Sequence, residues 1–81
     1  MDGDNNGRLM VENIANWKKV SDSWFSKYIT LAGTNWTELS SEDLQRINGD
    51  KFELIDRISK RYFIHRPAAE RQIETWFGKL Q

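Results

Sequence analysis

The strongest constraint on the fold is the spacing of apolar residues in the first half of the chain. Successive members of this set are three or four residues apart: Met10, Ile14, Trp17, Val20, Trp24, Tyr28 and Leu31. At about 100° per residue this spacing places them within roughly 120° of one helix face. A loop at Ser21-Asp22-Ser23 would break the phase. We therefore predict one long helix, with or without a kink at the serines, that ends at Gly33 in a left-handed cap.

A capping signal predicts a short second helix after a connector that contains Trp36. Ser40 is followed three residues later by Asp43, which is the spacing of a capping box. Asn48-Gly49 favours a turn that ends this helix.

The last third of the chain predicts two further amphipathic helices, separated by a short apolar hinge at Phe63-Ile64. The first begins at Asp50 and carries the stripe Leu54, Ile55, Ile58 and Tyr62. The second has Pro67 in its first turn and carries the stripe Ala69, Ile73, Trp76 and Leu80. No window alternates with a period of two residues, so no strand is predicted. The predicted fold is all-α: a small four-helix domain with one long N-terminal helix and three shorter ones.

The length of 81 residues predicts a single domain. Residues 1–7 are small and polar and read as a flexible tail, which leaves 8–81 as one helical domain. The chain has no cysteine, which excludes a disulfide framework and a zinc–thiolate site. Lys and Arg balance Asp and Glu at 12 each, which disfavours a general nucleic-acid binder. Apolar runs no longer than three residues predict no membrane insertion, so we expect a cytoplasmic protein.

Charge is uneven along the chain although the total is zero. Residues 36–56 carry a net charge of −4, whereas residues 57–71 carry +4. The five cations of the second segment predict a basic face for an anionic partner: Arg57, Lys60, Arg61, Arg66 and Arg71. The alternative is that they pair with neighbouring acids, since Glu53 precedes Arg57, and Asp56 precedes Lys60, by four residues.

The four tryptophans of the chain admit two interpretations. They form the core, because large aromatic side chains contribute most of the buried area in a small domain. Alternatively, Trp17 and Trp24 on the long first helix also contact a partner, since aromatic residues are enriched in interfaces.

No catalytic or metal-binding constellation is evident. Asp2, Asp4 and Asn6 match the opening of a calcium-binding loop, but its twelfth position is Asn13 where glutamate is required. His65 is the one histidine and is expected at the start of the last helix. We therefore predict no catalytic residue, no metal and no cofactor.

A set of spaced residues covers most of 16–76, and Asn16-Trp17-Lys18 precedes it. The set comprises Trp36-x-x-Leu39-Ser40-x-x-Asp43-Leu44-x-x-Ile47-x-Gly49, Leu54-x-x-x-Ile58-x-x-Arg61-Tyr62-x-Ile64 and Ala69-Glu70-x-Gln72-Ile73-x-x-Trp76. This pattern resembles the CsbD-like family of small hydrophilic bacterial proteins. Two departures are a longer stretch from Trp17 to Trp36 and Phe63 where the family commonly has glycine.

The resemblance implies a compact helical domain, a role in the general stress response and no assigned reaction. The expected function is that of a non-enzymatic bacterial stress-response protein that acts by binding or by abundance. The alternative is a module that binds an anionic surface or nucleic acid through Arg57–Arg71. The expected partner is an unidentified protein, nucleic acid is disfavoured, and the chain is a monomer or a weak homo-oligomer.

Overall fold

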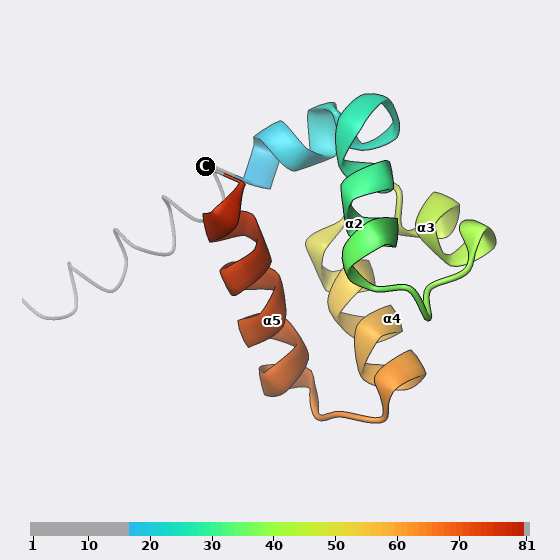
Figure 1. Ribbon diagram of the computed structural model, residues 1–81, viewed down its shortest axis with the longest axis vertical. Helices are drawn as coiled ribbons and strands as arrows, with labels where there is room; N and C mark the ends of the chain where they lie inside the picture. The colour runs from blue at the N-terminus through green and yellow to red at the C-terminus, as the bar shows by residue number, and fades with distance from the viewer. Residues whose placement is uncertain (1–16, 81) are drawn as a thin grey trace, which may run out of the picture.

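The computed structural model describes residues 17–80, which form helices joined by short connections (Figure 1). Residues 17–22 are α-helical, and five elements follow: η1 (Trp24–Tyr28), α2 (Ile29–Asn35), α3 (Ser41–Ile47), α4 (Lys51–Tyr62) and α5 (Arg66–Lys79). No strand occurs between residues 17 and 80, so the all-α prediction is confirmed for this part of the chain. The predicted tail at 1–7, with Met10 and Ile14, lies outside the described residues.

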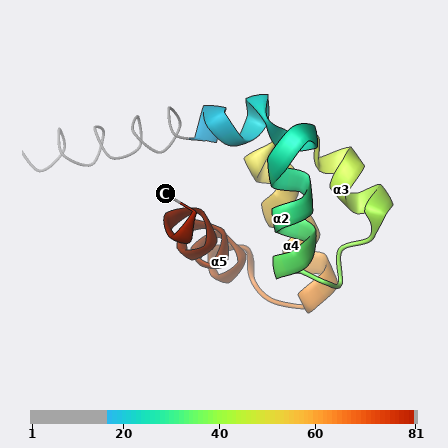
Figure 2. The ribbon, with the colours of Figure 1, turned by 45° about the horizontal axis from the view of Figure 1, so that its top comes forward.

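The predicted long first helix is bent at the serines rather than straight. Ser23 lies in a turn, and its carbonyl accepts from Lys27 N at 2.9 Å and from Tyr28 N at 3.2 Å. The second bond spans five residues, which defines the π-helical turn η1. Residues 17–22 therefore run at a steep angle to α2 in both views (Figure 1, Figure 2). The predicted single first helix becomes three helical elements.

The prediction that this region ends at Gly33 in a left-handed cap is wrong. α2 continues to Asn35, and Trp36 N donates to Ala32 O at 2.8 Å. Gly33 instead allows α2 to approach α3, because a Cβ atom there would lie 3.1 Å from Leu44 Cδ1.

The predicted capping box at Ser40 and the predicted helix start at Asp50 are both confirmed. Ser40 Oγ accepts from Asp43 N, and Asp43 Oδ2 accepts from Ser40 N, each at 3.0 Å, which completes the capping box of α3. Asp50 caps α4 by accepting from Phe52 N at 2.8 Å. Asn48 and Gly49 leave α3 with φ of 50° and 78°, as the turn prediction requires.

Phe63 ends α4 in the left-handed conformation, with φ 55° and ψ 47°. This is the position at which the CsbD-like pattern has glycine, which adopts that conformation without strain. The phenyl ring is also 93% exposed. Phe63 therefore carries backbone strain without a packing contribution that offsets it.

The core lies where α4 packs against α3 on one side and against α5 on the other, and α2 packs against α3 (Figure 1, Figure 2). All four tryptophans are buried, which confirms their core assignment: Trp17, Trp24, Trp36 and Trp76. The Trp36 and Trp76 rings meet edge to face at a centroid distance of 5.0 Å. Ile58 and Ile73 fill the same core with no exposed surface. No helix within residues 17–80 is long and apolar enough to cross a membrane.

Candidate functional site

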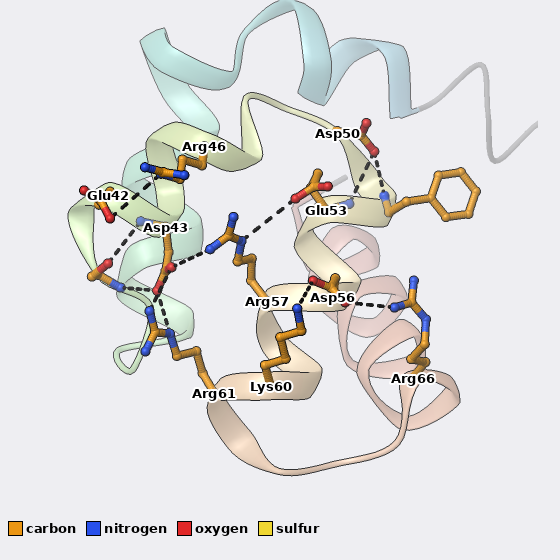
Figure 3. A network of polar contacts seen from close by, with 12 residues as sticks. Glu42, Asp43, Arg46, Asp50, Glu53, Asp56, Arg57, Lys60, Arg61 and Arg66 are labelled. Atoms are coloured by element: carbon orange, nitrogen blue, oxygen red, sulfur yellow. Dashed lines mark hydrogen bonds and ion pairs between the residues drawn. The ribbon is translucent and has the colours of Figure 1, made fainter.

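Asp43 is the centre of an ion-pair network that joins α3 to α4 (Figure 3). Its Oδ2 accepts from Arg61 Nε at 2.8 Å, and its Oδ1 accepts from Arg61 Nη2 at 3.0 Å and from Arg57 Nη1 at 3.1 Å. Asp43 is 2% exposed. A buried carboxylate is stable when it is paired and hydrogen-bonded, and here two guanidinium groups and the Ser40 amide provide those partners.

The network holds the Asp43 carboxylate in its charged form. Hydrogen bonding from Arg61 lowers the pKa of Asp43 from 3.8 to about 2, and this effect outweighs the opposing effect of burial. The same contact raises the pKa of Arg61. A carboxylate with so low a pKa is a weak general base at neutral pH. Its role in this arrangement is to connect α3 with α4.

Asp56 forms a second pairing site on α4. Its two carboxylate oxygens contact Lys60 Nζ and Arg66 Nη1, each at 3.0 Å (Figure 3). Hydrogen bonding from Lys60, together with Arg66, lowers the pKa of Asp56. The Arg66 contact links the middle of α4 to the beginning of α5.

The predicted basic face is therefore largely neutralised by internal ion pairs. The two pairs predicted from four-residue spacing are present: Asp56–Lys60, and Arg57–Glu53 with Nε and Oε1 3.9 Å apart. The structure adds pairs between helices that spacing does not reveal, from Arg57 and Arg61 to Asp43 and from Arg66 to Asp56. Arg71 is the exception, since no ion pair within residues 17–80 includes it.

Arg71 lines a shallow pocket of about 390 Å³ between α5 and the end of α2, which we call the α5 pocket. Asn35 contributes from α2, and six residues contribute from α5: Ala68, Arg71, Gln72, Thr75, Trp76 and Lys79. Lys79 likewise has no ion pair with a described residue. The pocket thus contains two cations and several uncharged polar groups.

The sequence prediction missed every member of this pocket except Arg71 as a site residue. Lys79 follows Arg71 by eight residues, a spacing that places both on one side of a helix. The sequence alone therefore indicates that these two cations lie on the same face. Asn35 comes from another helix, and its position depends on how α2 packs.

Trp17 and Trp24, the two tryptophans assigned to a partner surface, lie in the core at 8% and 1% exposure. The indole Nε1 of Trp17 donates to Gly49 O, and that of Trp24 donates to Leu44 O, both at 2.9 Å. These bonds fix residues 17–24 against α3 and the turn that follows it.

The remaining candidates give no site within the described residues. His65 is the N-cap residue of α5 and makes no side-chain capping bond. No group of three His, Cys, Asp or Glu residues suited to a metal ion occurs in residues 17–80. The calcium-loop pattern at Asp2, Asp4 and Asn6 lies outside this range.

Comparison with known proteins identifies one relevant relative. The chain is 31% identical over 61 residues to the UPF0337 protein ECA0631 of Pectobacterium atrosepticum, an alignment that covers 75% of this chain and 87% of the relative. No family model matches the chain. No solved structure matches it. Because the alignment spans most of both proteins, the chain belongs to the UPF0337 family, which is the CsbD-like family.

Proposed function

We propose that this chain is a non-enzymatic bacterial stress-response protein that acts in the cytoplasm by binding or by abundance. The observation that carries the proposal is that two of its acidic side chains are engaged in internal ion pairs. Asp43 and Asp56 each hold two cations, and both carboxylates are charged at neutral pH. Acid–base catalysis favours a group whose pKa lies near the working pH, and these two carboxylates lie well below it.

The stress-response role is supported by membership of the UPF0337 family and by the resemblance of 16–76 to the CsbD-like pattern. We expect the amount of the protein to rise when the bacterium enters a general stress response. We also expect a strain that lacks the gene to survive these conditions less well than its parent.

A deletion strain tests this role. It is complemented with the wild-type gene, with an empty vector, and with an unrelated hydrophilic helical protein expressed to the same level. Rescue by the wild type alone supports a binding function, and rescue by both proteins supports action by abundance. Equal survival of the deletion strain and its parent under each stress, with no rise in protein level, contradicts the proposal.

The non-enzymatic character needs a separate measurement. The purified protein is incubated with a metabolite extract of stressed cells, and the mixture is followed by mass spectrometry. We expect no compound to change in proportion to protein concentration and time. A compound consumed by the folded protein, but not by heat-unfolded protein, contradicts this part of the proposal.

The alternative function is binding of nucleic acid or an anionic surface by the end of the molecule around Phe63. Lys60 and Arg66 remain 72% and 55% exposed although both pair with Asp56. Between them in sequence, Phe63 offers an exposed ring on which a base can stack. This alternative predicts a gel shift with single-stranded DNA that weakens with salt and is lost in Phe63→Gly. The absence of a shift at low salt contradicts it.

A further inference from the structure

The α5 pocket has an uneven distribution of charge around its helix. At about 100° per residue, its six α5 residues occupy roughly 140° of the helix circumference. The two acids of α5, Glu70 and Glu74, lie outside that arc. The side of α5 that faces the pocket therefore carries cations and no carboxylate.

The two cations of the pocket are about two helical turns apart in α5. Arg71 and Lys79 are eight residues apart, which is about 12 Å along a helix axis at 1.5 Å per residue. Both are exposed and neither pairs with a described carboxylate, so both can bind an anion. Because the two side chains start about 12 Å apart along the helix axis, a ligand with two anionic groups can contact both cations.

The part of the pocket between the cations is polar and has one fixed donor. Gln72 Oε1 accepts from the buried Trp36 Nε1 at 3.0 Å, which leaves the Gln72 Nε2 amide as a donor of defined orientation. Thr75 adds a hydroxyl and Asn35 adds an amide from the other wall. Trp76 and Ala68 supply the apolar surface. Hydroxyl groups of a ligand can pair with these side chains while its C–H groups contact the tryptophan.

We propose that the α5 pocket binds a small polyhydroxylated ligand with an anionic group at each end, a sugar bisphosphate or a sugar dicarboxylate. Arg71 binds one anionic group and Lys79 binds the other, while Gln72, Thr75 and Asn35 contact the body of the ligand. A volume of about 390 Å³ is within the range of small-molecule sites. The inference rests on the proposed binding role and states what is bound.

The experiment is a titration of the ¹⁵N-labelled full chain at low ionic strength, followed by NMR. The probes are a hexose 1,6-bisphosphate, a hexarate dicarboxylate, inorganic phosphate and a neutral hexitol. The indole N–H of Trp36 reports on the pocket through its bond to Gln72. The indole of Trp24 bonds to the carbonyl of Leu44, away from the pocket, and serves as the internal reference.

We expect at least one of the probes with two anionic groups to shift the resonance of the Trp36 indole N–H in a saturable way. The resonance of the Trp24 indole N–H should not shift. Inorganic phosphate should bind at least about tenfold more weakly, because it lacks the second anionic group. The double variant Arg71→Gln/Lys79→Gln should lose at least about tenfold in affinity for the two-ended probe. Its matched control is Lys19→Gln/Arg46→Gln, which removes one lysine and one arginine elsewhere on the surface and should bind as the wild type does.

Several outcomes would overturn the proposal: no saturable shift with either two-ended probe, equal affinity for inorganic phosphate or the hexitol, or undiminished binding by the Arg71→Gln/Lys79→Gln variant. Both replaced residues are exposed, so an unchanged thermal midpoint is expected and separates loss of the site from loss of the fold. The titration measures ligand binding, whereas the complementation experiment measures survival of the bacterium. Failure of the pocket is therefore distinguishable from failure of the proposed function.

Discussion

Replacing Asp43 with asparagine should destabilise the fold by about 2–3 kcal/mol. The pKa of Asp43 falls from 3.8 to about 2 on folding, which corresponds to about 2.5 kcal/mol at 1.4 kcal/mol per pKa unit. Asparagine keeps an oxygen for the Ser40 amide but leaves Arg57, which is 27% exposed, without its carboxylate partner in α3. For a domain of this size, the loss should lower the thermal midpoint by roughly 10–20 °C.

The effect should depend on pH in a defined direction. The pKa of Asp43 is lower in the folded state than in the unfolded state, so the unfolded chain binds more protons between the two values. The contribution of Asp43 is therefore complete above about pH 5 and is lost as the pH falls toward 2. The difference in the free energy of unfolding between the wild type and Asp43→Asn should therefore shrink as the pH falls over this interval. Asp56, whose pKa is also lowered, is present in both proteins and cancels in the difference.

Urea unfolding followed by tryptophan fluorescence measures this difference at pH 7 and in steps down to pH 2. Glu42→Gln is the matched control, because Glu42 lies in the same first turn of α3 but its side chain is 78% exposed. That control should change the free energy of unfolding by no more than about 0.5 kcal/mol. Equal stability of the wild type and Asp43→Asn at pH 7, or a gap that stays constant down to pH 2, would refute the reasoning.

Four further predictions follow from the backbone and the core. Phe63→Gly should stabilise the fold by about 1 kcal/mol, because glycine relieves the left-handed strain, and a lower urea midpoint would contradict this. Trp76→Ala should cost about 3–5 kcal/mol, so a thermal midpoint near that of the wild type would show that the ring is not in the core. Gly49→Ala should cost more than about 1 kcal/mol, since φ is 78° and a Cβ atom would lie 2.8 Å from Ser21 Cα. Gly78→Ala meets no atom within 4 Å and should instead stabilise α5 by up to about 1 kcal/mol; equal effects of the two alanines would contradict both predictions.

The features that the sequence predicts well are those set by local chemistry. Ser40 and Asp50 bond to amides two or three residues away, so their capping roles follow from short-range spacing alone. Pro67 is likewise found in the first turn of α5, as expected. Ala69 and Ile73 are buried because their stripe follows the helical period.

The features that were missed depend on contacts between helices. The sequence predicts a cap at Gly33 because glycine commonly ends helices, but the close approach of Leu44 in α3 explains the glycine there instead. The bend at Ser23 accommodates an extra residue in one helical turn, and the preceding and following residues continue the helical period. Arg61 is attached to Asp43 across 18 residues, so spacing along one helix cannot reveal its partner.

The carbonyl of Gly49 accepts hydrogen bonds from both Trp17 Nε1 at 2.9 Å and Ser21 Oγ at 2.7 Å. These bonds close loops of 32 and 28 residues, whereas the capping box forms within four adjacent residues. Closing a longer loop costs more chain entropy, so docking of residues 17–22 should come late in folding. The same segment should be the first to detach when the protein opens partially. Its amides should then exchange with solvent faster than those of α4, and the fluorescence of Trp17 should change before the rest of the fold is lost.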